Sequence, residues 1–333
     1  MAPARVLAGE AGRGPGVAPP GPLLGGVEAG GTKFVCVIGR GPDAIEARQR
    51  IEVAEPGRTI GAAVRFFADA AERGLPVAAL GVGSFGPVEL DAGSAYYGRI
   101  TATPKPGWSG TDMVGPWARA LGVPVGFDTD VNAAALAEGK WGAARGLDAF
   151  VYLTVGTGIG GGSVVGGRLL RGRGHPEMGH LAVPRRDGDR FDGVCPFHGA
   201  CLEGMASGPA IAARFGRRAE ALDPAGQARA VEIVAWYLGA GVANLVYALA
   251  PQRVVVGGGV AQLPGLLDAV RAELGARLHG YPGVAAHGEA GFLAPAALGG
   301  MAGPAGALLL AERALHDSGT KRGPGNPRGR AVE

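Results

Sequence analysis

The sequence predicts an α/β protein built from two lobes. Short apolar runs of strand length alternate with stretches of helical spacing along most of the chain. Three of the apolar runs adjoin a glycine cluster, so the same strand-and-turn signal recurs. At 333 residues the chain is long enough for about two domains. Alternating strands and helices favour helices layered on central sheets, and two such lobes with a cleft between them account for the recurrence.

The expected elements follow from the period of the apolar residues and from glycine and proline punctuation. The expected strands are 33–38, 45–53, 77–83, 123–127, 150–155, 163–169 and 253–256. The expected helices are 59–74, 111–121, 132–142, 203–216, 224–249, 264–278 and 303–315. Residues 96–108 and 171–201 are expected to be irregular. The glycine- and proline-rich ends, 1–24 and 316–333, are expected to be disordered.

Composition argues against several classes of function. The formal net charge is +3, and no basic run is interleaved with aromatic residues, so no nucleic-acid partner is predicted. No run of 18 consecutive apolar residues and no signal-like leader occur, so no membrane association is predicted. Three cysteines do not make a disulfide framework, which favours the reducing cytoplasm.

Glycine clusters at 30–33, 156–162 and 257–259 are candidate phosphate-binding loops. Backbone N–H groups without neighbouring Cβ atoms can approach phosphate oxygens closely, and two of the clusters carry a threonine hydroxyl. None matches the Walker A pattern or the Rossmann fingerprint. The alternative for each cluster alone is an ordinary tight turn.

Asp130 is the candidate catalytic carboxylate, because it lies between the strand 123–127 and the helix that follows. At the mouth of a cleft it can accept the proton of a substrate hydroxyl that attacks a γ-phosphate. The alternative is a helix cap, although Asp128 and Thr129 can also fill that position.

Four residues form a candidate zinc site with the pattern H-x14-C-x2-H-x2-C: His180, Cys195, His198 and Cys201. Zinc takes four nitrogen or sulfur ligands, and a complete set indicates a structural ion. His175 competes with His180 for the fourth position. Glu177 and Glu203 flank the segment, where they can meet sugar hydroxyls or remain solvated surface charges.

These motifs together resemble the ROK sugar kinases, and most closely the bacterial zinc-containing fructokinases, over roughly residues 25–315. The matching stretches are GGVEAGGTKFVC (25–36), ATPKPGW (102–108), DTDVNAAALAEG (128–139), YLTVGTGIGGG (152–162), HPEMGH (175–180), CPFHGACLEGMASGPAI (195–211) and VVVGGGV (254–260). The resemblance implies a two-lobed, actin-like ATPase (ribonuclease H-like) fold. It implies lobes at 25–127 and 128–302, a zinc loop at 175–203, and helix 303–315 packed back on the first lobe.

The resemblance also implies site roles, with Asp130 as the general base. The implied ATP-binding residues are Gly31, Thr32, Lys33, Thr157, Gly158, Pro209, Gly257 and Gly258. The implied sugar-binding residues are Asp130, Glu177, His180 and Glu203, and the implied zinc ligands are His180, Cys195, His198 and Cys201. Mg²⁺ is implied with ATP, and a homodimer is implied as the assembly.

Two departures from the wider family bear on the substrate. Thr129 stands where many members have asparagine, and His198 stands where many have cysteine. Together with TPKPGW they favour fructose over glucose, mannose or another hexose. Some relatives are sugar-responsive repressors, but those carry a winged helix-turn-helix domain, whereas only about 24 residues precede the kinase-like part here. A non-catalytic sugar sensor is a further alternative, since fold does not fix function, but Asp130 and the phosphate loops, whose loss would indicate a sensor, are present.

Overall fold

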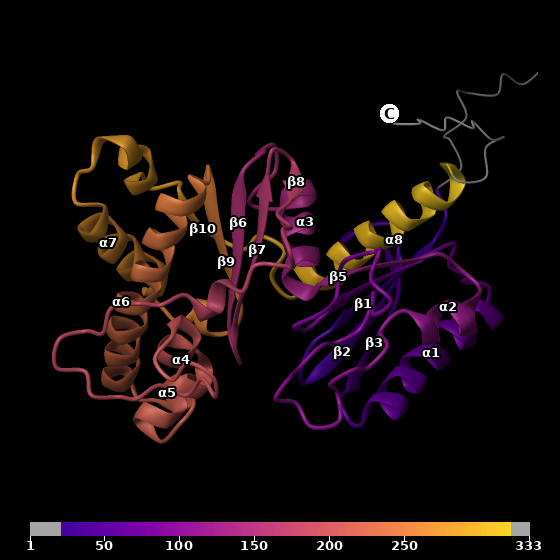
Figure 1. The fold of residues 1–333 in the computed structure, drawn as a ribbon, viewed down its shortest axis with the longest axis horizontal. Helices are drawn as coiled ribbons and strands as arrows, with labels where there is room; N and C mark the ends of the chain where they lie inside the picture. The colour runs from indigo at the N-terminus through magenta and orange to yellow at the C-terminus, as the bar shows by residue number, and fades with distance from the viewer. Residues whose placement is uncertain (1–20, 321–333) are drawn as a thin grey trace, which may run out of the picture.

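The computed structural model describes residues 21–320 and has two lobes, each built on a five-stranded sheet (Figure 1). The strand order is β3-β2-β1-β4-β5 in the first sheet and β10-β9-β6-β7-β8 in the second. Counted along the chain, the first three strands of each sheet pair antiparallel with one another in sequence. The fourth and fifth strands of each sheet run parallel to its first strand. The lobes therefore share one topology, and the predicted two-lobed α/β class is confirmed.

The elements have the following bounds. The strands are β1 (Leu24–Ala29), β2 (Lys33–Gly39), β3 (Ile45–Glu52), β4 (Leu80–Ser84), β5 (Val125–Thr129), β6 (Phe150–Val155), β7 (Ile159–Val165), β8 (Arg168–Leu169), β9 (Arg253–Gly257) and β10 (Leu293–Pro295). The α-helices are α1 (Pro56–Glu72), α2 (Gly115–Leu121), α3 (Asp130–Trp141), α4 (Leu202–Ala206), α5 (Gly208–Phe215), α6 (Pro224–Leu249), α7 (Leu266–Leu278) and α8 (Ala302–Thr320).

Both faces of the first sheet are covered, which explains why β2 is apolar from Phe34 to Ile38. Phe34, Cys36 and Ile38 point into the core shared with α1. Val35 and Val37 alternate with them and pack in the cluster that includes residues of α8. Because the Cys36 thiol is buried, its pKa is raised to about 12, and this cysteine is a packing residue.

The last helix, α8, returns to the first lobe and lies against its sheet (Figure 1). A Cβ atom at Gly81 of β4 would lie 1.9 Å from the carbonyl oxygen of Ala307, and one at Gly306 would lie 1.8 Å from that of Ala133 in α3. Glycine is thus required at both contacts. The close contact with α3 joins α8 to the helix that also covers β6 and β7 of the second lobe.

Several elements differ from the sequence expectation. The strand β1 was not expected, because its glycines disfavour strands; Gly25 is needed where Leu80 packs on the backbone. Glycines 160–162, expected in a loop, lie inside β7, since α3 packs directly on that strand. The expected helix 203–216 is two helices, because α4 ends at Ser207, whose side chain caps α5. The short strand β10 was also not expected.

The chain ends are only partly described. Strand β1 begins at Leu24, and α8 continues to Thr320, five residues beyond its expected end. The remainder of the expected disordered leader and tail, residues 1–20 and 321–333, lies outside the described residues.

Helix α6 is long and apolar enough to cross a membrane by length and hydropathy. However, 78% of its apolar window is buried inside the protein. Val234, Leu238 and Val242 belong to the main core of the second lobe. Packing in that core accounts for the composition of the helix.

Candidate active site

Asp130 lies where β5 passes into α3, at the base of the cleft between the lobes. The cap of α3 is Thr129, whose hydroxyl accepts a hydrogen bond from the backbone N–H of Asn132 at 3.1 Å. The Asp130 carboxylate interacts with backbone N–H groups next to it in the chain, and Oδ1 accepts the N–H of Val131 at 2.8 Å. The helix therefore does not need the Asp130 carboxylate as its cap, and the carboxylate is available to the cleft.

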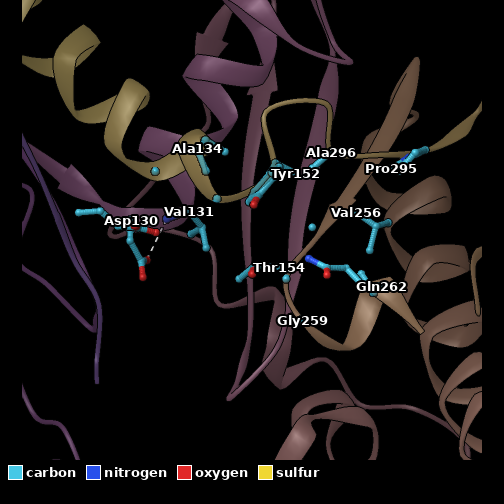
Figure 2. A pocket seen from close by; sticks show the side chains of 18 of the residues that line it. Asp130, Val131, Ala134, Tyr152, Thr154, Val256, Gly259, Gln262, Pro295 and Ala296 are labelled. Carbon is cyan, nitrogen blue, oxygen red and sulfur yellow. Dashed lines mark hydrogen bonds between the residues drawn. The ribbon is translucent and has the colours of Figure 1, made fainter. Parts of the chain in front are cut away.

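Two pockets meet at Asp130. One, of about 430 Å³, is lined by Glu28 and Lys33 of the first lobe and by Tyr152, residues 256–259, Ala261 and Gln262 of the second. Figure 2 shows this pocket, with Asp130 on one wall and Gln262 on the other. The adjoining pocket, of about 480 Å³, is lined by the loops predicted to bind phosphate and sugar. Asp130, Val131 and Thr154 line both pockets.

The residues expected at the nucleotide divide between these two pockets. Lys33, Gly257 and Gly258 line the first pocket. Gly31, Thr32, Thr157 and Gly158 line the second. Pro209 lines neither; it lies in the first turn of α5, where the N–H of Gly208 donates to the carbonyl of Gly156 at 2.7 Å.

The residues expected at the sugar lie together. Glu177, His180 and Glu203 all line the second pocket with Asp130. Glu203 Oε2 also accepts a hydrogen bond from the N–H of Ile159 at 2.9 Å, directly after the glycine loop. Glu203 is thus not an isolated surface charge, and it connects the sugar side of the pocket with the phosphate loop.

The carboxylates of this cleft influence one another. Burial and the nearby charge of Glu28 raise the pKa of Asp130 to about 7. Burial also raises the pKa of Glu28, and the charge of Lys33 partly offsets this. A carboxyl with a pKa near neutrality is suited to accept a proton at physiological pH.

Glu28 is a candidate functional residue that the sequence analysis missed. It lies on β1 two residues before the first glycine loop and lines the nucleotide-side pocket. The available signal was its position, since a charged residue in an otherwise apolar strand beside a phosphate loop requires an explanation. It was overlooked because β1 itself was not expected.

The four predicted metal ligands converge at one point. The candidate ligand atoms of His180, Cys195, His198 and Cys201 all lie within 4.8 Å of one another. His180 Nδ1 is 3.5 Å from Cys201 Sγ and 3.8 Å from Cys195 Sγ, and His198 Nδ1 is 3.7 Å from Cys195 Sγ. Tetrahedral zinc with ordinary bond lengths separates its nitrogen and sulfur ligands by about 3.6 Å. The donor set and spacing therefore fit a four-coordinate zinc ion.

The rival ligand, His175, lies elsewhere. Its Nε2 accepts a hydrogen bond from the backbone N–H of Val88 at 3.1 Å, and its Nδ1 is 3.5 Å from Glu177 Oε1. It is not a member of the metal cluster. The geometry therefore favours His180 over His175 as the fourth ligand.

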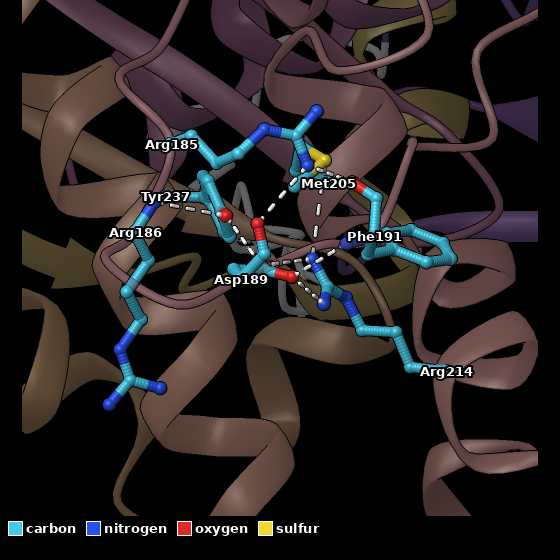
Figure 3. A network of polar contacts seen from close by, with 7 residues as sticks. All are labelled: Arg185, Arg186, Asp189, Phe191, Met205, Arg214 and Tyr237. Carbon is cyan, nitrogen blue, oxygen red and sulfur yellow. Dashed lines mark hydrogen bonds and ion pairs between the residues drawn. The ribbon is translucent and has the colours of Figure 1, made fainter.

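The segment between His180 and Cys195 is anchored by a buried polar network (Figure 3). Asp189 forms a bidentate ion pair with Arg214 of α5, at 2.8 and 2.9 Å, and accepts the hydroxyl of Tyr237 in α6 at 2.5 Å. The Arg214 guanidinium also lies 4.1 Å from the ring centroid of Phe191. The network fixes this irregular segment to two helices of the second lobe.

Comparison with known proteins identifies the family. The family model described as "ROK family" matches residues 24–314. The chain belongs to the ROK family. It is 42% identical to a putative fructokinase of Bacillus subtilis over 88% of this chain and 96% of that protein. It is 44% identical to a fructokinase of Zymomonas mobilis over 75% of this chain and 83% of that protein.

A solved ROK family structure has the same architecture. The glucokinase of Streptomyces griseus, in complex with glucose and AMPPNP, is 28% identical with a TM-score of 0.70, covering 87% of this chain and 99% of that one. This chain therefore has the actin-like two-lobed fold. The family that the sequence motifs predict is confirmed.

Proposed function

We propose that this ROK protein is an ATP-dependent fructokinase, which transfers the γ-phosphoryl group of ATP to D-fructose and yields fructose 6-phosphate and ADP. The observation that carries the proposal is the position of Asp130, which lines both the nucleotide-side and the sugar-side pockets. A base at this junction reaches the hydroxyl that must attack the γ-phosphate.

In the proposed reaction Asp130 is the general base. Its carboxylate accepts the proton of the attacking hydroxyl, and the raised pKa makes it a stronger base than an exposed aspartate. The glycine loops at 30–33 and 156–158 bind the ATP phosphates through backbone N–H groups, with Thr32 and Thr157 as hydroxyl donors. Gly257 and Gly258 border the adenosine.

Mg²⁺ is proposed to accompany ATP and to neutralise charge on its β- and γ-phosphates. Mg²⁺ is commonly bound by one or two carboxylates together with substrate phosphates. Glu28 fits this requirement, since it lies on the wall of the nucleotide-side pocket and carries a buried carboxyl. Lys33 adds a positive charge to the same wall.

The sugar is proposed to lie against Glu177, His180 and Glu203. His180 directs Nδ1 to the cysteine thiols, so Nε2 is left for a sugar hydroxyl. Zinc bound by His180, Cys195, His198 and Cys201 would act structurally, because four protein ligands leave no open position. Its proposed task is to hold this loop and the His180 ring at the pocket.

Fructose is proposed as the hexose because both fructokinase relatives align over most of the chain. The TPKPGW segment contributes to the site, since Thr103 and Pro104 line the sugar-side pocket and Lys105 Nζ donates to the Gly31 carbonyl. A cytoplasmic location fits the free thiols and the need for ATP. A homodimer remains a prediction.

A coupled ADP-release assay with Mg-ATP tests the proposal against fructose, glucose, mannose and N-acetylmannosamine. Strong preference for fructose is expected, with Asp130→Asn as the inactive control. Preference for another hexose would retain the kinase and refute the fructose assignment. No turnover with any hexose would refute the kinase and favour a sugar sensor.

A further inference from the structure

His175 lies on the sugar-side pocket and contacts both lobes. Its ring is nearly buried, with 8% of the side chain exposed, and it belongs to the segment that joins β8 to the metal-binding region. Its Nε2 accepts the N–H of Val88, which follows β4 of the first lobe and is 87 residues away in sequence. The ring also packs on the backbone, because a Cβ atom at Gly86 would lie 3.4 Å from His175 Cε1.

The second ring nitrogen faces the proposed sugar-binding carboxylate. Because the N–H of Val88 donates to Nε2, that nitrogen carries no hydrogen, and the ring hydrogen belongs on Nδ1. Nδ1 lies 3.5 Å from Glu177 Oε1. Glu177 is 46% exposed, and apart from His175 no described hydrogen bond or ion pair restrains its carboxylate.

The 85–88 loop that His175 contacts is itself part of the pocket. Gly86 and Pro87 line the sugar-side pocket together with His175 and Glu177. Phe85 packs edge-to-face on Trp108, at 5.4 Å between ring centroids. Trp108 closes the TPKPGW segment, whose Thr103 and Pro104 also line the pocket. One histidine therefore connects the first-lobe rim of the pocket with the Glu177 carboxylate of the second lobe.

We propose that His175 is a positioning residue for the hexose, which holds the Glu177 carboxylate and the 85–88 loop at the spacing that a bound sugar requires. This inference rests on the proposed function and deepens it. Neither ring nitrogen is assigned to the sugar itself: one is bound by Val88 and the other faces Glu177. His175 therefore acts through its two neighbours.

The test uses three variants of the full-length, metal-loaded protein. His175→Ala removes both contacts. His175→Gln retains an acceptor near the Nε2 position for Val88, and His175→Asn retains a donor near the Nδ1 position for Glu177. Arg168→Gln, an exposed change on β8, is the matched control. Fructose and Mg-ATP are each varied at a saturating concentration of the other, and fructose binding is measured by calorimetry.

For His175→Ala we expect the KM and Kd for fructose to rise at least about tenfold, with the KM for ATP changed less than about twofold. The variants His175→Gln and His175→Asn should each restore part of the affinity for fructose that His175→Ala loses. In the double variant His175→Ala with Glu177→Gln, the KM for fructose should rise by less than the product of the two separate rises, because the residues act as a pair.

Equal rises in both KM values, or independent effects of His175 and Glu177, would overturn the proposal and leave His175 a packing residue. If His175→Ala does not fold, an unchanged fructose KM in both the glutamine and asparagine variants would also overturn it. Failure of the proposed function is distinguished by the wild type, which would then phosphorylate no hexose.

Discussion

The buried carboxylate of Glu138 accepts a hydrogen bond from the backbone N–H of Leu298, 160 residues later in the chain, at 2.9 Å. It also accepts the N–H groups of Ala143 at 2.7 Å and Ala297 at 3.2 Å. Glu138 lies on α3, and residues 297 and 298 lie between Ala296 and Gly299, which line the nucleotide-side pocket. One carboxylate thus holds that wall against the helix that begins at Asp130.

Glu138→Ala is expected to destabilise the protein and to weaken ATP binding. The change leaves three N–H groups without their partner, which should cost at least about 2 kcal/mol in the free energy of unfolding. We also expect the KM for ATP to rise more than the KM for fructose. Urea denaturation and steady-state kinetics measure the two effects. Glu138→Gln, which keeps the shape and one acceptor, should lose less; equal losses in both variants would contradict this role.

Activity is expected to depend on the ionised form of Asp130. Since the pKa of this carboxyl is raised to about 7, kcat/KM should be half-lost near pH 7 and fall about tenfold per pH unit below it. Asp130→Asn should lower kcat by about 10² to 10⁴-fold and retain fructose and ATP binding. A pH–rate profile that is flat between pH 5 and 8 would exclude this carboxylate as the base.

The same pKa predicts the effect of Asp130 on stability. A folded-state pKa above the unfolded value means that ionisation disfavours the folded state as pH rises between the two values. Asp130→Asn should therefore unfold at the same or a higher temperature than the wild type at pH 8. Thermal scans at pH 5 and pH 8 measure this, and a clear loss of Tm at pH 8 would show that the charge stabilises the fold.

The metal site is expected to hold one zinc ion per chain. Cys195→Ser should lose the ion and lower Tm, because the irregular loop depends on the metal for its order. A strong chelator should have a similar effect on the wild type. Elemental analysis gives the stoichiometry, and Cys36→Ala, which removes the distant thiol in β2, is the control that keeps the metal. A metal-free wild type of equal stability would contradict the zinc site.

The ion pair of Asp189 and Arg214 is expected to stabilise the second lobe. Their side chains are only 11% and 10% exposed, so Asp189→Asn leaves a nearly buried guanidinium without its charge partner and should cost about 3 kcal/mol. Glu232→Gln, which removes the exposed partner of Arg186, should cost less than about 1 kcal/mol. Urea denaturation compares them, and equal costs would refute the difference between buried and exposed pairs.

The pH dependence of this ion pair follows from its pKa. The arginine and the Tyr237 hydroxyl hold the pKa of Asp189 well below its usual range, although burial opposes them. The contribution is therefore complete above the unfolded pKa of about 4 and decreases as pH falls below it. The difference in stability between wild type and Asp189→Asn should shrink between pH 5 and pH 2.

The sequence by itself determined the features that depend on neighbours along the chain. The strand 150–155 and the helix 224–249 have the predicted bounds, because their apolar patterns are uninterrupted and their ends carry turn or cap residues. The metal quartet was readable for the same reason, since three of its ligands lie within one short loop.

The tertiary structure alone decided the features that depend on distant contacts. Strand β1 contains glycines that disfavour a strand until the Leu80 side chain packs on them, and β10 is too short to recognise without β9 beside it. Glu28 and Glu138 likewise look like ordinary polar residues in the sequence, and His175 looks like a rival metal ligand. Their partners lie in the other lobe or more than a hundred residues away, and only folding brings those groups within hydrogen-bonding distance or into a shared pocket.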